Sequence, residues 1–298
     1  MSKQQSAVAT VLRDDKLFDA ERLAFAFSDQ LRATFDPEHC AMWLRWNPKP
    51  RPCFNRQLLS ALNEYSRLLE TKGGAIEHNG RTYTVGSSIL TSGVRGVFNF
   101  GGDLDLITTL IDQGNRAGLT EYGLACAKLV YRNYTCYDLP ITTISLVQGQ
   151  CLGGGFEAAL SSLVVIAERS ARFGFPEPMY NLFPAMGAIS CVRRRTEDEA
   201  FADELISKAK IYSAEELLKW GLIDAVVDDG KGPAAVQEYL RNEREVTRFI
   251  YRARRARWPL RREELRDMVT RWVDKALSLN PRDLRLMGRI VARQDSVI

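Results

Sequence analysis

The chain has 298 residues, of which 45% are apolar and 26% are charged, and its formal net charge is +4. These values are ordinary for a globular protein and exclude a disordered or strongly polyanionic chain. No apolar run approaches the roughly 20 residues of a membrane helix. The N-terminus lacks an apolar signal core, so we expect a cytoplasmic protein without membrane attachment.

Cysteine and histidine usage narrows the chemistry further. The six cysteines are scattered without a C-x-x-C pair, which predicts free thiols in a reducing compartment, without a disulfide frame or a zinc site. Only two histidines are present, His39 and His78, and we expect both to be structural or exposed. The chain therefore has few histidines for a metal site or for Ser-His-Asp catalysis, and no metal is expected.

The N-terminal half predicts strands that alternate with helices. Residues 1–37 are typical of a polar, partly helical lead-in, and the alternation over 40–46 predicts a strand. Further elements are predicted in chain order: a helix from Asn55 to 73–74, extended pieces about a turn at 78–80, a strand at 89–92, a loop at 97–104, and helices at 104–113 and 122–134.

The second half begins with a strand near 141–147, followed by a glycine-rich turn and a helix over 156–162. Strands are predicted at 163–167 and 223–227, and Ser213 and Glu216 form a capping box. The rest is mostly helical. We therefore predict an α/β protein with a lead-in (1–37), a core (38–230) and a helical C-terminal region (231–298).

Two glycine-bearing turns, at 100–103 and 153–155, each precede a predicted helix. Glycine lets the backbone approach a ligand closely, and a helix start leaves unpaired N–H groups and a positive dipole end. If folding brings the turns together, their N–H groups form an oxyanion hole, for which a thioester is a natural substrate. For either turn alone, a tight turn is the favoured explanation. A dinucleotide fingerprint does not occur.

Two glutamates accompany these turns. Glu157 follows the second glycine turn, and Glu177 lies between Pro176 and Pro178 in the segment 173–178. Two carboxyl groups in one apolar pocket cannot both ionise cheaply, so one tends to hold a proton. That arrangement suits a general acid and a general base near neutral pH. Taken singly, a glutamate is more often a surface residue, and the pair gains weight from its glycine and proline setting.

The order and spacing of several motifs resemble the crotonase (enoyl-CoA hydratase/isomerase) superfamily across roughly residues 40–230. The motifs are FGGD at 100–103, the stretch 149–157, FGFPE at 173–177, and the segment 212–227. The resemblance implies a spiral of repeated ββα units with a helical C-terminal region. It also implies that Gly102 and Gly154 donate the oxyanion-hole N–H groups and that Glu157 and Glu177 are the acid and base, with no cofactor.

A closer resemblance is to the diffusible signal factor synthases. It is carried by the segments 97–104, 146–149, 153–160 and 182–188, and by the tail around Trp272 and 284–287. Those bacterial enzymes dehydrate 3-hydroxyacyl-carrier-protein thioesters and then hydrolyse them, which yields cis-2-unsaturated fatty acid signals for quorum sensing. The resemblance implies a dehydratase and thioesterase in which Glu177 removes the Cα proton and Glu157 protonates the departing hydroxyl.

The walls of an acyl-chain tunnel are predicted from apolar residues in the same segments. The candidates are Tyr180, Leu182, Phe183, Met186, Trp272 and Ile290. Met186 and Trp272 are preferred because they lie in segments that the closer family shares. Ordinary core packing explains any one of them equally well.

The same residues are compatible with other functions. An enoyl-CoA hydratase acting on coenzyme A thioesters uses the same glutamates. Arg51 and the arginines of 241–262 suit either coenzyme A or an acidic acyl carrier protein. A regulatory role, held by a sensor's receiver domain, is compatible with catalysis, whereas RNA binding is the weakest alternative. By analogy with the superfamily we expect a homo-oligomer, a trimer or a hexamer.

Overall fold

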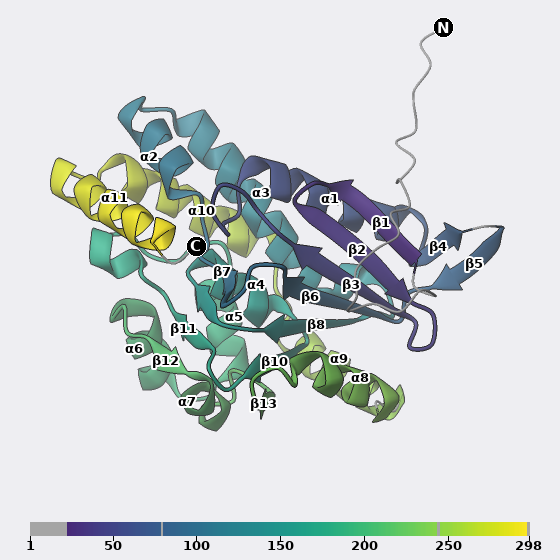
Figure 1. The fold of residues 1–298 in the computed structure, drawn as a ribbon. Helices are drawn as coiled ribbons and strands as arrows, with labels where there is room; N and C mark the ends of the chain where they lie inside the picture. The colour runs from purple at the N-terminus through teal and green to yellow at the C-terminus, as the bar shows by residue number, and fades with distance from the viewer. Residues whose placement is uncertain (1–22, 79, 243–244, 297–298) are drawn as a thin grey trace, which may run out of the picture.

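The computed structural model describes residues 23–78, 80–242 and 245–296, which are built on a large and a small β-sheet (Figure 1). The large sheet has seven strands in the order β1-β2-β3-β6-β8-β10-β13. β1, β2 and β3 pair antiparallel, and the strands from β3 onward pair parallel. The strands are β1 (Leu23–Ser28), β2 (Leu31–Asp36), β3 (Ala41–Trp46), β6 (Ser87–Ser92), β8 (Thr142–Val147), β10 (Val164–Glu168) and β13 (Ala225–Val227).

The small sheet has four short strands in the order β12-β11-β9-β7. A separate hairpin pairs β4 with β5 and stands at one end of the molecule (Figure 1). The bounds of these strands are β7 (Val97–Asn99), β9 (Gln150–Leu152), β11 (Arg172–Gly174), β12 (Tyr212–Ser213), β4 (Ala75–His78) and β5 (Arg81–Thr84).

The helices cover both faces of the large sheet. They are α1 (Arg56–Thr71), α2 (Leu104–Asp112), α3 (Arg116–Tyr134), the 3₁₀ turn η1 (Cys136–Asp138), α4 (Gly154–Ser161), the 3₁₀ turn η2 (Glu177–Tyr180), α5 (Ala188–Arg195), α6 (Glu199–Ser207), α7 (Ala214–Lys219), α8 (Gly232–Asn242), α9 (Glu245–Arg257), α10 (Arg262–Leu277) and α11 (Pro281–Asp295).

The chain repeats one unit along this spiral. A strand of the large sheet is followed by a strand of the small sheet and then by a helix: β6-β7-α2 is one such unit and β8-β9-α4 is the next. In the first unit, β3 and α1 are not separated by a full strand of the small sheet. Phe54, which lies between them, forms only a single β-bridge, to Gly102. The expected α/β fold, a spiral of ββα repeats with a helical C-terminal region, is confirmed.

Side-chain alternation divides the core into two parts. Along β3, Met42 and Leu44 face the main cluster, whereas Trp43 faces the opposite side of the sheet, as a period of two requires. Val236 and Leu240 of α8 pack on that opposite side. The main cluster lies between the large sheet, the small sheet and helices α1, α3, α4 and α10, and it surrounds the site described below.

Local signals explain several element boundaries. The Asn55 side chain accepts a hydrogen bond from Leu58 N and so begins α1, as predicted. The capping box of Ser213 and Glu216 at the start of α7 is also confirmed. Helix α3 begins at Arg116, earlier than the predicted residue 122, because Asn115 caps it by accepting from Gly118 N.

Two expectations are wrong. The part of the lead-in that the structure describes, residues 23–37, holds the hairpin of β1 and β2, which extends the sheet beside β3; residues 1–22 lie outside the described part. The segment 97–104, predicted as a loop, begins with β7, whose partner β9 also went unpredicted. Strands of three residues are too short to show a periodicity. In the described residues no helix has the length and apolarity to cross a bilayer.

Candidate active site

The two glycine turns meet at the start of α4. A methyl group built on Gly101 would stand 2.6 Å from Gly154 N, and one on Gly154 would stand 3.5 Å from Gly102 N. Gly101 also has a φ of +98°, which favours glycine. The structure therefore brings together the backbones of the two turns predicted to share a ligand, and at Gly101 only a residue without a side chain permits this approach.

The N–H groups of Gly102 and Gly154 are available for a ligand. Gly154 is the first residue of α4, where an amide has no acceptor inside the helix. Neither amide takes part in a hydrogen bond among the described residues. Both glycines line one cavity. Two neighbouring donors directed into a cavity have the composition of an oxyanion hole, in which each donor is worth about 3 kcal/mol at a transition state.

Tyr122 of α3 fixes the first glycine turn. Its hydroxyl accepts from Asp103 N at 2.8 Å and donates to Phe54 O at 2.8 Å. Burial raises the pKa of Tyr122 well above its usual range, so the hydroxyl stays protonated and can donate. The side chain of Asp103 in turn caps α2 by accepting from Leu106 N. The residue that follows Gly102 is therefore held on both its backbone and its side chain.

Glu157 is buried within the first turn of α4, and its exposed fraction is 3%. Its Oε1 accepts two backbone hydrogen bonds, from Met186 N and Ala188 N, each 3.0 Å long. Burial raises the pKa of Glu157 to about 7, although these amide donors favour the carboxylate and lower it. Desolvation outweighs the hydrogen bonds, so the carboxyl group titrates near neutral pH.

Glu177 begins η2 and faces the second glycine turn. A methyl group on Gly153 would stand 2.7 Å from Glu177 Oε1, and Gly153 has a φ of +50°, so no other residue fits there without strain. The other oxygen, Oε2, is buried and has no hydrogen-bond partner. Burial, together with the charge of Glu157, raises the pKa of Glu177 to about 8. The two carboxyl groups thus form a coupled pair that tends to share one proton.

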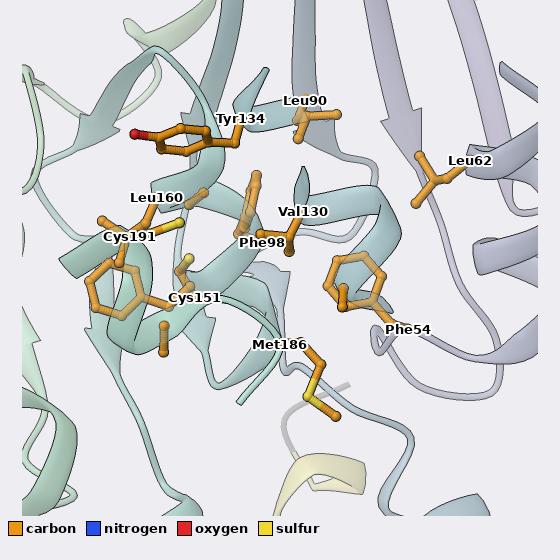
Figure 2. Close-up of a cluster of buried hydrophobic side chains, with 14 of the residues drawn as sticks. Phe54, Leu62, Leu90, Phe98, Val130, Tyr134, Cys151, Leu160, Met186 and Cys191 are labelled. Carbon is orange, nitrogen blue, oxygen red and sulfur yellow. The ribbon is translucent and has the colours of Figure 1, made fainter. Parts of the chain in front are cut away.

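The cavity contains most of the predicted site residues. About 940 Å³ of space, including the open mouth, lies between α1, α3, α4, η2 and α10. Figure 2 shows the labelled lining side chains Phe54, Leu62, Leu90, Val130 and Met186. The predicted residues that line the cavity are Gly102, Gly154, Glu157, Glu177, Tyr180, Leu182, Phe183, Met186 and Trp272.

Ile290 is brought close to the core but not to this cavity. It lies on α11, half-buried against the main cluster, and is not among the lining residues. The lining residues that the sequence did not indicate come mainly from α1 and α3, whose helical spacing predicts only a buried face. They include Leu59, Leu62, Tyr65, Ser66, Tyr122, Leu129 and Asn133.

The basic candidates are mostly engaged within the chain. Arg51 binds Asp105 and Asp295, so it is not a free cation. Arg255 donates to Ser161 O and Ser162 O at the end of α4. Arg244, and the side chains of Arg248, Arg252 and Arg254, lie outside the described part. A basic rim for a carrier therefore stays a prediction.

A cation could be held only away from the cavity, as far as the described residues show. Asp36, Glu38 and His39 place their ligand atoms within 4.8 Å of one another in the turn between β2 and β3. His39 Nδ1 lies 3.0 Å from Asp36 Oδ2, within hydrogen-bond distance, and this contact accounts for much of the approach. None of the three residues lines the cavity.

Comparisons with known proteins bear on the family and the fold of the chain. The family model for enoyl-CoA hydratase/isomerase matches residues 66–258. An enoyl-CoA hydratase from Bacillus halodurans has a TM-score of 0.71 at 20% identity, over 88% of this chain and 100% of that chain. An enoyl-CoA hydratase/isomerase from Xanthobacter autotrophicus Py2 scores 0.68 at 18% identity, over 89% and 98%. DspI from Pseudomonas aeruginosa scores 0.59 at 20% identity, over 82% and 85%. At these identities the structures establish the fold.

Proposed function

The chain belongs to the enoyl-CoA hydratase/isomerase family, and from that premise we propose that it dehydrates a 3-hydroxyacyl thioester and then hydrolyses it to a free cis-2-unsaturated fatty acid signal. One observation carries this proposal. Two carboxyl groups that titrate near neutral pH, Glu157 and Glu177, share a largely apolar cavity with the unpaired amides of Gly102 and Gly154.

The elimination uses both carboxyl groups and the oxyanion hole. The thioester oxygen accepts hydrogen bonds from Gly102 and Gly154. Glu177 as carboxylate removes the Cα proton, and the electron pair moves onto the thioester oxygen as an enolate. The pair then returns to form the C2–C3 double bond, the C3–O bond breaks, and Glu157 as carboxylic acid protonates the hydroxyl, which leaves as water.

Hydrolysis reuses the same groups. A glutamate in its carboxylate form takes a proton from water, whose oxygen attacks the thioester carbon. The amides of Gly102 and Gly154 stabilise the tetrahedral oxyanion, and the C–S bond breaks when this intermediate collapses. The thiol of the carrier leaves with a proton, and the unsaturated fatty acid is released. The residues named here require no metal or redox cofactor for either step.

The experiment that tests the proposal is a product analysis. Purified protein is incubated with one 3-hydroxyacyl group presented on acyl carrier protein or on coenzyme A, and products are identified by mass spectrometry. We expect free unsaturated acid from the carrier-protein form, and no product from Glu157→Ala or Glu177→Ala. Interconversion of the coenzyme A thioester without release of free acid would instead identify an enoyl-CoA hydratase, which is the alternative function that the family itself supports.

A further inference from the structure

The segment that follows α3 has a strained backbone. Cys136, Tyr137 and Asp138 have φ values of +55°, +59° and +54°, a left-handed conformation that residues with a Cβ atom disfavour. Elsewhere in the part of the chain that the structure describes, non-glycine residues in this conformation stand singly. Two hydrogen bonds close the turn, from Asp138 N to Thr135 O at 3.1 Å and from Leu139 N to Cys136 O at 3.0 Å. Strain of this kind persists only where the surrounding packing imposes it, and it often marks a functional position.

The strained turn buries Tyr137 in the wall of the cavity. Tyr137 is exposed by 5%, packs in the main cluster and lines the cavity, whereas Cys136 packs in the cluster on the opposite side of the large sheet. The Tyr137 ring meets the Tyr65 ring edge-on, with centroids 5.9 Å apart and an angle of 89° between the ring planes. Tyr65 also lines the cavity, and its hydroxyl is paired with Ser88 Oγ at 2.8 Å. The two rings therefore form one aromatic wall.

Helix α3 shows where along the cavity this wall lies. The helix passes Tyr122, whose hydroxyl accepts from Asp103 N beside the oxyanion hole, and it lines the cavity as far as Asn133. A rise of 1.5 Å per residue separates Tyr122 and Asn133 by about 16 Å along the helix axis. Tyr137 comes after the end of α3. On this side of the cavity, Tyr137 therefore lies at the end away from the glycine turns.

Helix α1 leads to the same place from the other side. It begins just after Phe54, whose carbonyl oxygen accepts from the Tyr122 hydroxyl at 2.8 Å, so α1 also starts near the oxyanion hole. Its lining residues continue from Leu59 to Tyr65, close to the C-terminal end of the helix. Because Tyr65 and Tyr137 contact each other there, the two sides of the cavity meet at these rings.

We infer that the rings of Tyr65 and Tyr137 close the far end of the cavity, and that Tyr137 is a specificity-determining residue that limits the length of the acyl chain. This inference rests on the proposed function for the placement of the thioester at Gly102 and Gly154. A chain that reaches the wall can be extended only by displacing a ring, and the turn that carries Tyr137 holds its ring in place. Forcing extra methylene groups into a packed site disfavours binding.

The test measures how binding depends on chain length without turnover. Calorimetry uses N-methyl amides of saturated fatty acids of roughly eight to fourteen carbons, which offer a carbonyl oxygen to the oxyanion hole but cannot be dehydrated. Tyr137→Ala removes the ring. A ligand two carbons longer than the tightest ligand of the wild type should therefore bind the variant about 10-fold more tightly than it binds the wild type, because each methylene group that becomes buried contributes about 4-fold.

Two matched variants separate the ring from its surroundings. Tyr137→Phe keeps the ring, and Asp138→Gly removes one strained residue from the same turn without altering a lining side chain, so both should keep the preferred length of the wild type. Tyr137→Leu serves as the second variant if the alanine variant unfolds, and thermal melting confirms that each protein is folded.

A preferred length that neither Tyr137→Ala nor Tyr137→Leu changes overturns the inference, even if the enzyme forms the expected product. An equal change in Asp138→Gly also overturns it, because that variant keeps the ring. Conversely, a longer preferred chain in the Tyr137 variants of a protein that forms no unsaturated acid refutes the proposed function alone, because binding is measured without turnover.

Discussion

At the residue scale, the two glutamates differ in what stabilises their charge. Glu157 receives two backbone hydrogen bonds, whereas Glu177 Oε2 receives none and faces the charge of Glu157. The unliganded site therefore favours the proton on Glu177. The proposed elimination starts from the opposite arrangement, with the proton on Glu157.

Which glutamate removes the Cα proton is decided by isotope exchange. A saturated acyl thioester without a 3-hydroxyl group cannot eliminate, but its Cα proton can exchange in D₂O, and exchange needs only the base and the oxyanion hole. If Glu177 is the base, Glu177→Gln should lower the exchange rate by about 100-fold or more, whereas Glu157→Gln should retain exchange. Mass spectrometry of the recovered thioester gives the rates, and the reverse pattern would assign the base to Glu157.

The raised pKa values also predict how stability depends on pH. Both carboxyl groups have an ordinary pKa of 4.5 in the unfolded chain and pKa values of about 7 and 8 in the folded one, so between these limits the folded state binds more protons. The free energy of unfolding should then fall as pH rises from about 5 to 8, by at most about 1.4 kcal/mol per pH unit for each proton held.

Urea unfolding across this pH range measures the slope. Glu177→Gln removes one titrating group, so the free energy of unfolding of the variant should fall less steeply with pH than that of the wild type. The difference in stability between the variant and the wild type should therefore shift in favour of the variant towards pH 8. Glu121→Gln, an exposed glutamate on α3, is the control and should leave the slope unchanged. Parallel slopes for the wild type and Glu177→Gln would show that Glu177 is not held protonated by the fold.

At the element scale, Tyr122 ties helix α3 to two segments that are distant in sequence. Its hydroxyl joins Phe54 O, just before α1, to Asp103 N, just after the first glycine turn. A methyl group on Gly102 would lie 3.5 Å from the same hydroxyl, so Tyr122 stands directly behind the amide proposed to bind the thioester oxygen. We assign it as a positioning residue, because it acts through the glycine turn.

Tyr122→Phe should therefore lower kcat by about 10-fold while leaving KM nearly unchanged, because the oxyanion hole acts mainly at the transition state. The pH optimum should stay in place, since neither glutamate is altered. Stability should drop by about 1–3 kcal/mol, because Asp103 N and Phe54 O lose their partner. Steady-state kinetics and urea unfolding provide these values. Tyr131→Phe on the same helix is the control, since the Tyr131 ring packs beneath Arg262. Equal losses of kcat in both variants would show that Tyr122 does not position the glycine turn.

The elements that the sequence predicts well are those with a long periodicity or a cap. The spacing of Leu58, Leu62 and Leu69 indicates α1, and its cap Asn55 marks where that helix begins. The small sheet could not be predicted in this way, because its strands have two or three residues and are defined by pairing partners far along the chain. The hairpin of β1 and β2 was missed although Leu31, Ala33 and Phe35 alternate with polar residues along β2, a pattern that predicts a strand.

At the scale of the whole molecule, residues from both ends of the chain meet at one cavity. Trp46 follows the N-terminal hairpin, Glu157 and Glu177 lie in the middle, and Trp272 comes from the C-terminal helices. The motifs around Glu157 and Glu177 predicted the reacting end of the cavity because chemistry restricts which residues serve there. The opposite end, near Asn133, could not be predicted, because any residue on the buried face of α3 looks the same in sequence.

Helix α10 of the C-terminal region is thus part of the site, and not an appendage beside it. Helix α10 packs along α3, and Trp272 on its inner face is exposed by only 3% while lining the cavity. Because the Trp272 side chain packs in the hydrophobic core and also lines the cavity, Trp272→Ala should change two properties at once. Stability should fall by about 3–5 kcal/mol, as for other large-to-small core substitutions. The space vacated should also admit longer or bulkier acyl chains.

Urea unfolding gives the first value, and competition among 3-hydroxyacyl thioesters of different lengths, followed by mass spectrometry of the acids formed, gives the second. Trp258→Ala is the matched control, because Trp258 is 58% exposed and does not line the cavity, so both properties should stay close to those of the wild type. Trp272→Phe removes less volume, so the preference for acyl-chain length can still be measured with this variant if the alanine variant unfolds. A product profile that neither Trp272 variant alters would mean that the acyl chain does not reach α10, although the cavity does.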